Sequence, residues 1–521
     1  MSERRSEADA LVLEDGVAPA PPRVIRRGLR FKGDRLPQGD LLEAGRRPVV
    51  PADHVVRAVV EWVEKLDLTA FRAKHSPLGR MPMDPKFKLR VWVYASLVGM
   101  HAATRVASAL KTDAAFQLAA GGHAIGVSVL KDFRASHFDA LRDLNSQVLR
   151  LAVTAKLVSP RDLAVDSMRL EAAASSGSIR TLERSRKRLD ELNRADTASM
   201  TEAQRAAHTD KVSKHSAAIA RCKAEGRTSF STTAAEASLM KFPSGASKLG
   251  HRISLAAAGQ SERIVVHAFV DGAATDYGKL EALVMGARDA LIAAGIPVIQ
   301  GAAPMQVAAD AGYMKASDQA FVVRERAAQR VDVILPAPTE APTGRHFGRD
   351  AFVFEDNGDV ICPAGKPMSG PTTSADGRKT WQGRGCGACP LRAECTDGER
   401  RTISLNPATD ALRREIAARA AEPGAKARYG RRMATVEPVF SYLEDVMGFT
   451  RASSRRTKTV HAEVQMKILA YNLTRLMAAA KRGGRMRALA LVFAERPNGF
   501  ELCDLWWPQD GSDSDGEPAA T

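Results

Sequence analysis

The chain has 521 residues, of which 45% are hydrophobic and 26% charged; it is too long for one small core, so two or three domains are expected. The 76 Lys and Arg against 60 Asp and Glu give a net charge of +16, which favours a polyanionic partner such as nucleic acid over a small anion. Six cysteines do not form a secreted disulfide framework, and no apolar run approaches the roughly 18 residues of a membrane span. These features predict a soluble, cytoplasmic protein.

The N-terminal part is predicted to be helical. Residues 1–30 mix Ala, Pro and charged residues without periodicity and are predicted to be disordered. Helical periodicity then dominates residues 31–160, where the uniformly apolar segment 87–100 is expected to be the buried helix. Short helices around a break at Gly121 and Gly122 suit a DNA-binding unit of the helix-turn-helix kind. An all-helical scaffold without a DNA role fits the pattern equally well.

Two short apolar runs end in an aspartate, Asp166 and Asp310. A strand that ends in a carboxylate can hold a metal ligand at a sheet edge, whereas taken alone Asp166 is more simply the cap of a following helix. A third carboxylate, Glu437, lies in a segment predicted to be an amphipathic helix. Together the three could bind a pair of Mg²⁺ or Mn²⁺ ions, which prefer oxygen ligands and promote phosphoryl transfer when about 3.5–4 Å apart.

Further strands are predicted at 251–259 and 263–272, joined as a hairpin. Asp271, also at the end of an apolar run, and Asp276 behind it compete with Asp166 and Asp310 as candidate metal ligands, but the hairpin position of Asp271 indicates a turn residue instead. The expected order continues with a helix at 277–294, the Asp310 strand, a helix at 315–329 and a strand at 331–338. Three strands followed by alternating helices and strands is the order of an RNase H-like mixed sheet. The predicted fold is therefore α/β, with this core at residues 161–336.

Residues 171–250 are predicted to be a helical insertion between the first two strands of the core. Its segment 180–227 holds 12 Lys and Arg against 7 Asp and Glu. A solvated charged hairpin is the simpler interpretation, and contact with a DNA backbone is the second.

Residues 337–405 are rich in Pro and Gly and form a predicted Cys-rich insertion. A Cys-x-x-Cys pair with two further cysteines has the ligands for tetrahedral Zn²⁺; reduced thiols or an iron–sulfur cluster are the alternatives. The four cysteines are Cys362, Cys386, Cys389 and Cys395. Residues 406–485 are predicted to be helical from about Asp410 and to complete the core, and residues 486–521 to be a partly disordered tail.

Three blocks of the sequence resemble the catalytic segments of bacterial insertion-sequence transposases of the DDE class: VDSMRLEAAAS, VAADAGYMKASD and YGRRMATVEPVFSYLEDVMGFTR. The group resembled is the eleven-eighty-two group, related to the IS-four group, and the resemblance extends over roughly residues 30–480. It implies an RNase H-like catalytic domain, a divalent-metal cofactor, Asp166, Asp310 and Glu437 as the catalytic triad, and a bacterial, nucleoid-associated protein. The implied partners are terminal inverted repeats and target DNA, with a homo-oligomer assembled on the DNA.

The resemblance also implies DNA contacts by Tyr429 and Arg432, which match the start of a tyrosine–arginine–glutamate–lysine signature. The spacing from the arginine to the glutamate is one residue longer than usual, and Glu444 stands where a lysine is often found. Our hypothesis is that Arg455, Arg456 and Lys458 supply the positive charge that a lysine at this position would provide. The competing interpretations are a decayed or domesticated DNA-binding protein without catalysis, and a metal-cluster protein built on the cysteines.

Overall fold

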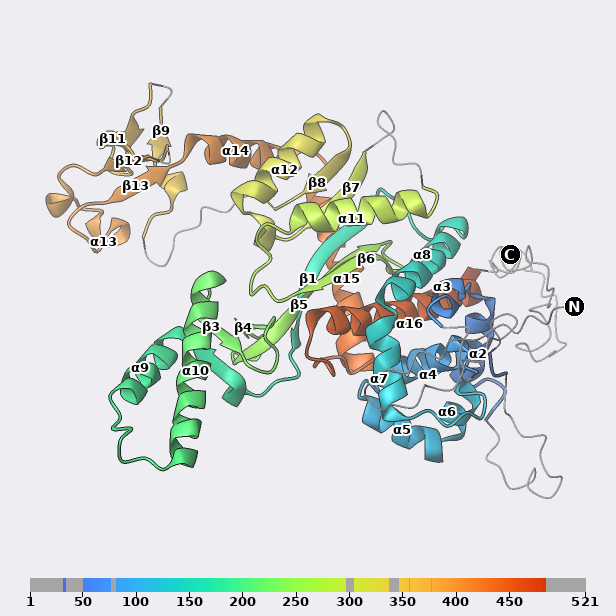
Figure 1. Ribbon diagram of the computed structural model, residues 1–521. Helices are drawn as coiled ribbons and strands as arrows, with labels where there is room; N and C mark the ends of the chain where they lie inside the picture. The colour runs from blue at the N-terminus through green and yellow to red at the C-terminus, as the bar shows by residue number, and fades with distance from the viewer. Residues whose placement is uncertain are drawn as a thin grey trace, which may run out of the picture.

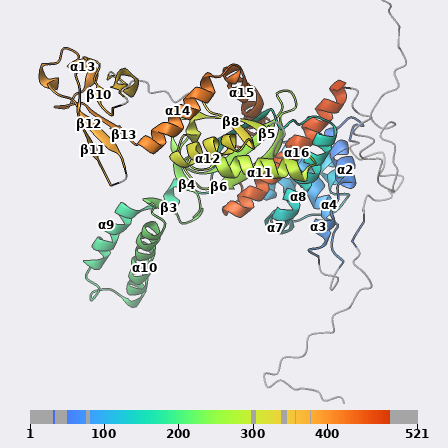
Figure 2. The same ribbon diagram turned by 90° about the horizontal axis from the view of Figure 1, so that it is seen from above.

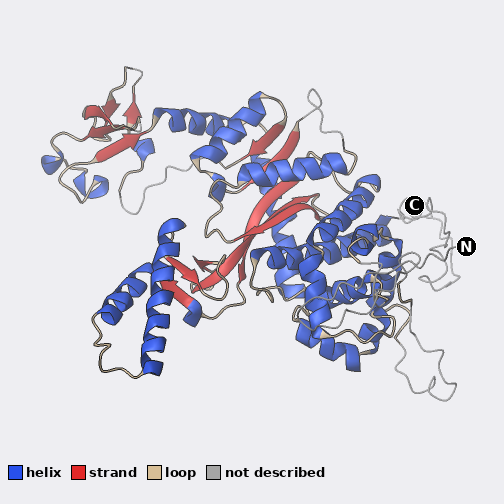
Figure 3. Ribbon diagram, in the orientation of Figure 1, coloured by secondary structure: helices blue, strands red, loops and turns tan. Residues whose placement is uncertain are grey.

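The computed structural model describes residues 31–33, 50–75, 81–296, 304–336, 346–355, 357–375 and 377–483. The predicted disordered segments 1–30 and 486–521 lie outside these residues. A mixed six-stranded sheet runs through the middle of the molecule, with helices on both sides (Figures 1 and 3). Its strands are β1 (Leu163–Glu171), β4 (Ser238–Lys241), β5 (Ser247–Ala258), β6 (Ile264–Asp271), β7 (Met305–Ala309) and β8 (Val331–Ile334).

Strand β1 is central in this sheet. It pairs antiparallel with β5 on one side and parallel with β7 on the other, and β8 continues the parallel part. Strands β4 and β6 both pair antiparallel with β5, each along a different half of that long strand. The predicted α/β class is confirmed by this mixed sheet, and the predicted hairpin between β5 and β6 is confirmed by their register.

One predicted strand end differs from the structure. The prediction that β1 ends at Asp166 is wrong: its parallel partner β7 ends opposite Val165, but β5 stays paired with β1 as far as Glu171. The prediction that the chain is helical from about Asp410 is confirmed, and this helical part is divided into separate segments. These are α14 (Pro407–Ala421), α15 (Ala425–Ser441), a π-helical turn (Tyr442–Val446) and α16 (Thr457–Gly483).

The interruptions have local causes. Gly424, before α15, adopts a φ of +77°, and Gly448, after the π-helical turn, adopts +60°. Both values favour glycine, and a helix cannot continue through them. Pro438 within α15 has no N–H to donate to the preceding turn, and the π-helical turn follows directly.

Helices α11 (Leu280–Ala293) and α15 lie on opposite sides of the sheet, with α12 (Ala316–Ala327) beside β8 (Figure 2). Helix α16 runs along the edge strand β6, where the amide side chain of Asn472 both donates to and accepts from the backbone of Val265, at 2.9 Å each. These bonds satisfy backbone groups at a sheet edge that would otherwise be unpaired. The helix thereby connects the sheet to the N-terminal helices.

The N-terminal helices pack around α16 and share one hydrophobic core with the sheet. The predicted buried helix is confirmed: α4 has buried residues on all of its sides, and it begins with Asp84 as its N-cap and Pro85 in its first turn. These helices are α2 (Val55–Lys65), α3 (Thr69–Arg72), α4 (Pro85–Leu97), α5 (Ala103–Thr112), α6 (Ala114–Ala119), α7 (Val127–Ser136) and α8 (Phe138–Thr154).

Two peripheral units extend from the sheet (Figures 1 and 2). The insertion after β1 forms a helical arm: β2 (Ile179–Thr181), α9 (Leu182–Asn193), α10 (Glu202–Ala224) and β3 (Ser229–Ser231). In its described residues, the Cys-rich insertion has a core of its own with five buried hydrophobic side chains. It contains β9 (Val353–Phe354), β10 (Val360–Ile361), β11 (Ser369–Thr373), β12 (Lys379–Gln382), α13 (Arg392–Cys395) and β13 (Thr402–Leu405).

Candidate active site

The sheet brings two remote aspartates together. Val165 of β1 is the register partner of Ala309 of β7, and the strands are parallel. Each of these residues is followed directly by an aspartate, Asp166 or Asp310, so the two carboxylates leave neighbouring strands at the same level. The third predicted residue, Glu437, is on α15, which packs against both strands. Three segments that are far apart in the sequence thus contribute one carboxylate each to the same place.

The guanidinium of Arg432 lies among these three carboxylates. Its Nη1 is 2.5 Å from Oδ2 of Asp166, and its Nη2 is 3.8 Å from Oδ1 of Asp310 and 3.9 Å from Oε1 of Glu437. The Arg432 side chain is 9% exposed, whereas those of Asp310 and Glu437 are 45% and 48% exposed. The hydroxyl of Tyr429, one helical turn before Arg432, donates to Oδ1 of Asp310 at 3.4 Å. Both residues implied as DNA contacts therefore lie in the carboxylate cluster.

The electrostatics of the cluster favour cations. Burial raises the pKa of Asp166; the Ser167 amide and Arg432 oppose this effect, and the nearby Asp310 carboxylate adds to it. Burial lowers the pKa of Arg432, but the carboxylates of Asp166 and Asp310 outweigh burial, so its pKa is raised overall. Three carboxylates around one guanidinium leave the cluster net negative. Its oxygen donors suit Mg²⁺ or Mn²⁺, although no three His, Cys, Asp or Glu side chains in the described part of the chain are grouped so that they could hold a metal ion.

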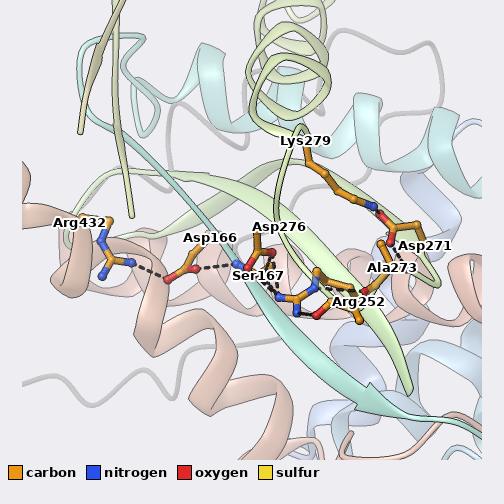
Figure 4. Close-up of polar contacts among 9 residues, drawn as sticks. Asp166, Ser167, Arg252, Asp271, Ala273, Asp276, Lys279 and Arg432 are labelled. Atoms are coloured by element: carbon orange, nitrogen blue, oxygen red, sulfur yellow. Dashed lines mark hydrogen bonds and ion pairs between the residues drawn. The ribbon is translucent and has the colours of Figure 1, made fainter. Parts of the chain in front are cut away.

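A second polar network adjoins Asp166 (Figure 4). The amide of Ser167 donates to Oδ1 of Asp166 at 2.7 Å, and the Ser167 hydroxyl donates to Asp276. Arg252 of β5 donates through Nη1 to both carboxylate oxygens of Asp276, at 2.8 Å each. From the sequence, Asp271 is interpreted as a turn residue and Asp276 as a second competing carboxylate. Asp271 does accept from a nearby backbone amide and pairs with Lys279, but Asp276 lies in the loop after β6 and points towards β1.

The remaining implied DNA contacts lie outside the carboxylate cluster. Arg455, Arg456 and Lys458, here called the α16 basic group, are exposed at the start of α16. Glu444, which stands at the position of the expected lysine, is half-buried in the π-helical turn. Burial, and then the neighbouring Asp445, raise its pKa.

The four cysteines of the Cys-rich insertion line one small pocket. Cys362 follows β10, Cys386 and Cys389 flank a single 3₁₀ turn, and Cys395 ends α13. Burial raises the pKa of the Cys395 thiol; Arg401 opposes this effect, and the other three thiols add to it. All four are free thiols in the structure. Of the other two cysteines, Cys222 is buried in α10 and Cys503 lies outside the described residues.

Fold and site together define a mixed α/β protein with three carboxylates gathered around one arginine. Residues 361–477 match the family model described as a transposase DDE domain. The match begins in the Cys-rich insertion and runs through α15 into α16, so it includes Glu437 and Arg432 but neither aspartate. It supports a transposase of the DDE type, for which DNA is the substrate. No curated protein and no solved structure matches the chain. Among the described residues, no helix has the length and apolar character needed to cross a bilayer.

Proposed function

We propose that the chain is the transposase of a bacterial insertion sequence of the eleven-eighty-two group. It cuts DNA at the ends of its element and joins the freed 3′-hydroxyl to target DNA. This proposal rests on one observation: the carboxylates of Asp166, Asp310 and Glu437 lie around the guanidinium of Arg432. The C-terminal part of the same chain matches a transposase DDE domain. The strand order β6-β5-β1-β7-β8, with β1, β7 and β8 parallel, supports an RNase H-like core.

In this proposal, Asp166, Asp310 and Glu437 hold Mg²⁺ or Mn²⁺. When bound, these ions activate the attacking oxygen and stabilise the leaving oxygen. The chain's own residues orient the ligands: the Ser167 amide fixes one oxygen of Asp166, and the Tyr429 hydroxyl contacts Asp310. Arg432 supplies a positive charge beside the same carboxylates, where a DNA phosphate would also be attracted.

DNA binding is assigned to the basic C-terminal part of the chain. Residues 428–487 hold 13 Lys and Arg against four acidic residues, and neutralising several phosphates makes DNA binding strongly salt-dependent. The α16 basic group is exposed and available for such contacts. Holding two element ends together requires more than one copy of the chain, so we also propose a homo-oligomer on DNA.

For the Cys-rich insertion we propose a structural Zn²⁺ held by Cys362, Cys386, Cys389 and Cys395. The support is that all four thiols line one pocket and that the core formed by the described residues of the insertion has five buried hydrophobic side chains. A unit this small commonly needs a metal or a cross-link to be stable. Its thiolates would form a closed tetrahedral site, separate from the oxygen donors of the carboxylate cluster.

The direct test incubates the protein with DNA that carries the inverted repeats flanking its gene, with Mg²⁺ or Mn²⁺ present. We expect strand cleavage at the element ends, and loss of that cleavage with retained DNA binding in Asp310→Asn. The competing function, a DNA-binding protein without catalysis, predicts binding without cleavage in the native protein. Intact carboxylates at all three positions favour the enzyme.

A further inference from the structure

Strand β5 contains a buried arginine. Arg252 is 2% exposed and is flanked along the strand by buried residues. A guanidinium removed from water is tolerated only when charge and hydrogen bonds compensate it. Arg252 is not part of the carboxylate cluster, so it needs hydrogen-bond acceptors of its own. These acceptors show which parts of the chain Arg252 holds together.

All the partners of Arg252 come from β1 and from the loop after β6. Its Nη1 donates to Ser167 Oγ at 2.7 Å and to Asp276. Its Nη2 donates to the carbonyl of Ala274 at 2.5 Å, and its Nε donates to that of Ala273 at 3.4 Å. One guanidinium thus fastens the 273–276 loop to β1, immediately beside Asp166.

Ser167 connects this network to the carboxylate cluster. The Ser167 hydroxyl donates to Asp276, while the backbone amide of the same residue donates to Oδ1 of Asp166 at 2.7 Å. The other oxygen of Asp166 faces Arg432. Both oxygens of Asp166 are therefore fixed, one of them by a residue that Arg252 and Asp276 hold in place (Figure 4).

A buried phenol provides an independent observation at the same place. Tyr313 is 1% exposed, and its hydroxyl has no hydrogen-bond partner in the structure. Burial raises its pKa, and the carboxylates of Asp276, Asp166 and Asp310 raise it further. Asp276 therefore acts electrostatically on the same buried phenol as Asp166 and Asp310, so it belongs to the surroundings of the carboxylate cluster.

We propose that Arg252 and Asp276 are positioning residues that act through Ser167 to orient the Asp166 carboxylate for cation binding. The inference rests on the proposed function and deepens it by adding residues to the same site. Neither residue needs to touch the cation. Their effect is to keep one Asp166 oxygen on the Ser167 amide, so that the carboxylate does not have to be ordered when the ion binds.

The test uses Mn²⁺ as the probe, with its binding to the full chain followed by electron paramagnetic resonance and thermal unfolding measured without metal. The test variants are Arg252→Lys and Asp276→Asn. The matched control is Arg134→Lys in α7, because Arg134 is also a buried arginine and contacts a carboxylate, a hydroxyl and a carbonyl. All three variants are expected to lower the unfolding temperature, so a general loss of stability is controlled for.

We expect Arg252→Lys and Asp276→Asn to weaken Mn²⁺ binding tenfold or more, and Arg134→Lys to leave it within twofold of the native protein. Affinities of the two test variants within twofold of native would overturn the inference. If either variant fails to fold, Ser167→Ala carries the test, because it removes only one hydroxyl. It is expected to weaken Mn²⁺ binding at least threefold, and an unchanged affinity would overturn the inference.

The inference and the proposed function fail in different ways. If the native protein binds Mn²⁺ and loses it in Asp310→Asn, but Arg252→Lys, Asp276→Asn and Ser167→Ala bind normally, the inference alone is refuted. If the native protein shows no Mn²⁺ binding that depends on Asp310, the proposed function is refuted, and the inference with it.

Discussion

Replacing Arg432 with Gln should have opposite effects on stability and on metal binding. Without metal, the guanidinium is the one cation among the three carboxylates of the cluster. Its removal leaves a largely buried Asp166 without its partner, and breaking such a pair costs about 3 kcal/mol. Asp310 and Glu437 add little to this cost, because their side chains are 45% and 48% exposed and solvent screens them.

The same change should tighten Mn²⁺ binding, because the ion no longer has to displace or approach a positive charge. We expect Arg432→Gln to unfold roughly 3 °C below the native protein without metal, and most of this deficit to disappear at saturating Mn²⁺ through linkage. Thermal unfolding with increasing Mn²⁺ measures both effects. The control is Arg431→Gln, an exposed neighbour on α15, which should behave like the native protein.

A deficit in Arg432→Gln that is the same with and without Mn²⁺ would refute this reasoning. It would mean that Arg432 stabilises the packing of its helix and that Mn²⁺ does not compete with its guanidinium for the carboxylates. Tighter Mn²⁺ binding in Arg431→Gln would also contradict the reasoning, because the effect would then be one of general charge.

Three further predictions concern other parts of the chain. Burial lowers the pKa of Lys467 to about 7, against the opposing effect of Glu463. Because the unfolded lysine stays protonated up to a higher pH, native stability should rise between pH 7 and 10.5, and Lys467→Met should remove this rise in pH-dependent unfolding experiments. Cys386→Ser with Cys389→Ser should release about one Zn²⁺ per chain by elemental analysis, whereas Cys222→Ser should release none; equal zinc in both would refute the cysteine site. Charge reversal of the α16 basic group should weaken DNA binding and reduce the slope of log K against log salt concentration by up to about three. An unchanged slope would show that the DNA binds elsewhere on the protein.

The sequence was most informative where a residue's role follows from its immediate neighbours. An apolar run before Asp166 and another before Asp310 predict strands that deliver a carboxylate, and the structure has strands there. The pairing of Val165 with Ala309, which sets the two aspartates side by side, joins residues that are 144 positions apart in the chain. No local pattern encodes that register.

The network around Asp276 could not be predicted for the same reason. Asp276 follows no apolar run, and its partners Arg252 and Ser167 are brought to it only by the pairing of β5 with β1. The available signal was Arg252 itself, an arginine followed by the largely apolar run ISLAAA in a predicted strand, where it required a buried partner. The continuation of β1 past Asp166 was missed in the same way, since only the long antiparallel partner β5 sustains it.

If Asp166, Asp310 and Glu437 form one site for divalent cations, a bound metal ion must lie close to all three segments. Fe²⁺ bound in place of Mg²⁺, with ascorbate and peroxide, cuts the polypeptide next to the ion, so the cut sites can be mapped by mass spectrometry. We expect cuts near all three residues in the same sample, and their joint loss in Asp310→Asn or in excess Mg²⁺. Cuts confined to one of the three segments, or cuts that persist in Asp310→Asn, would contradict a single site.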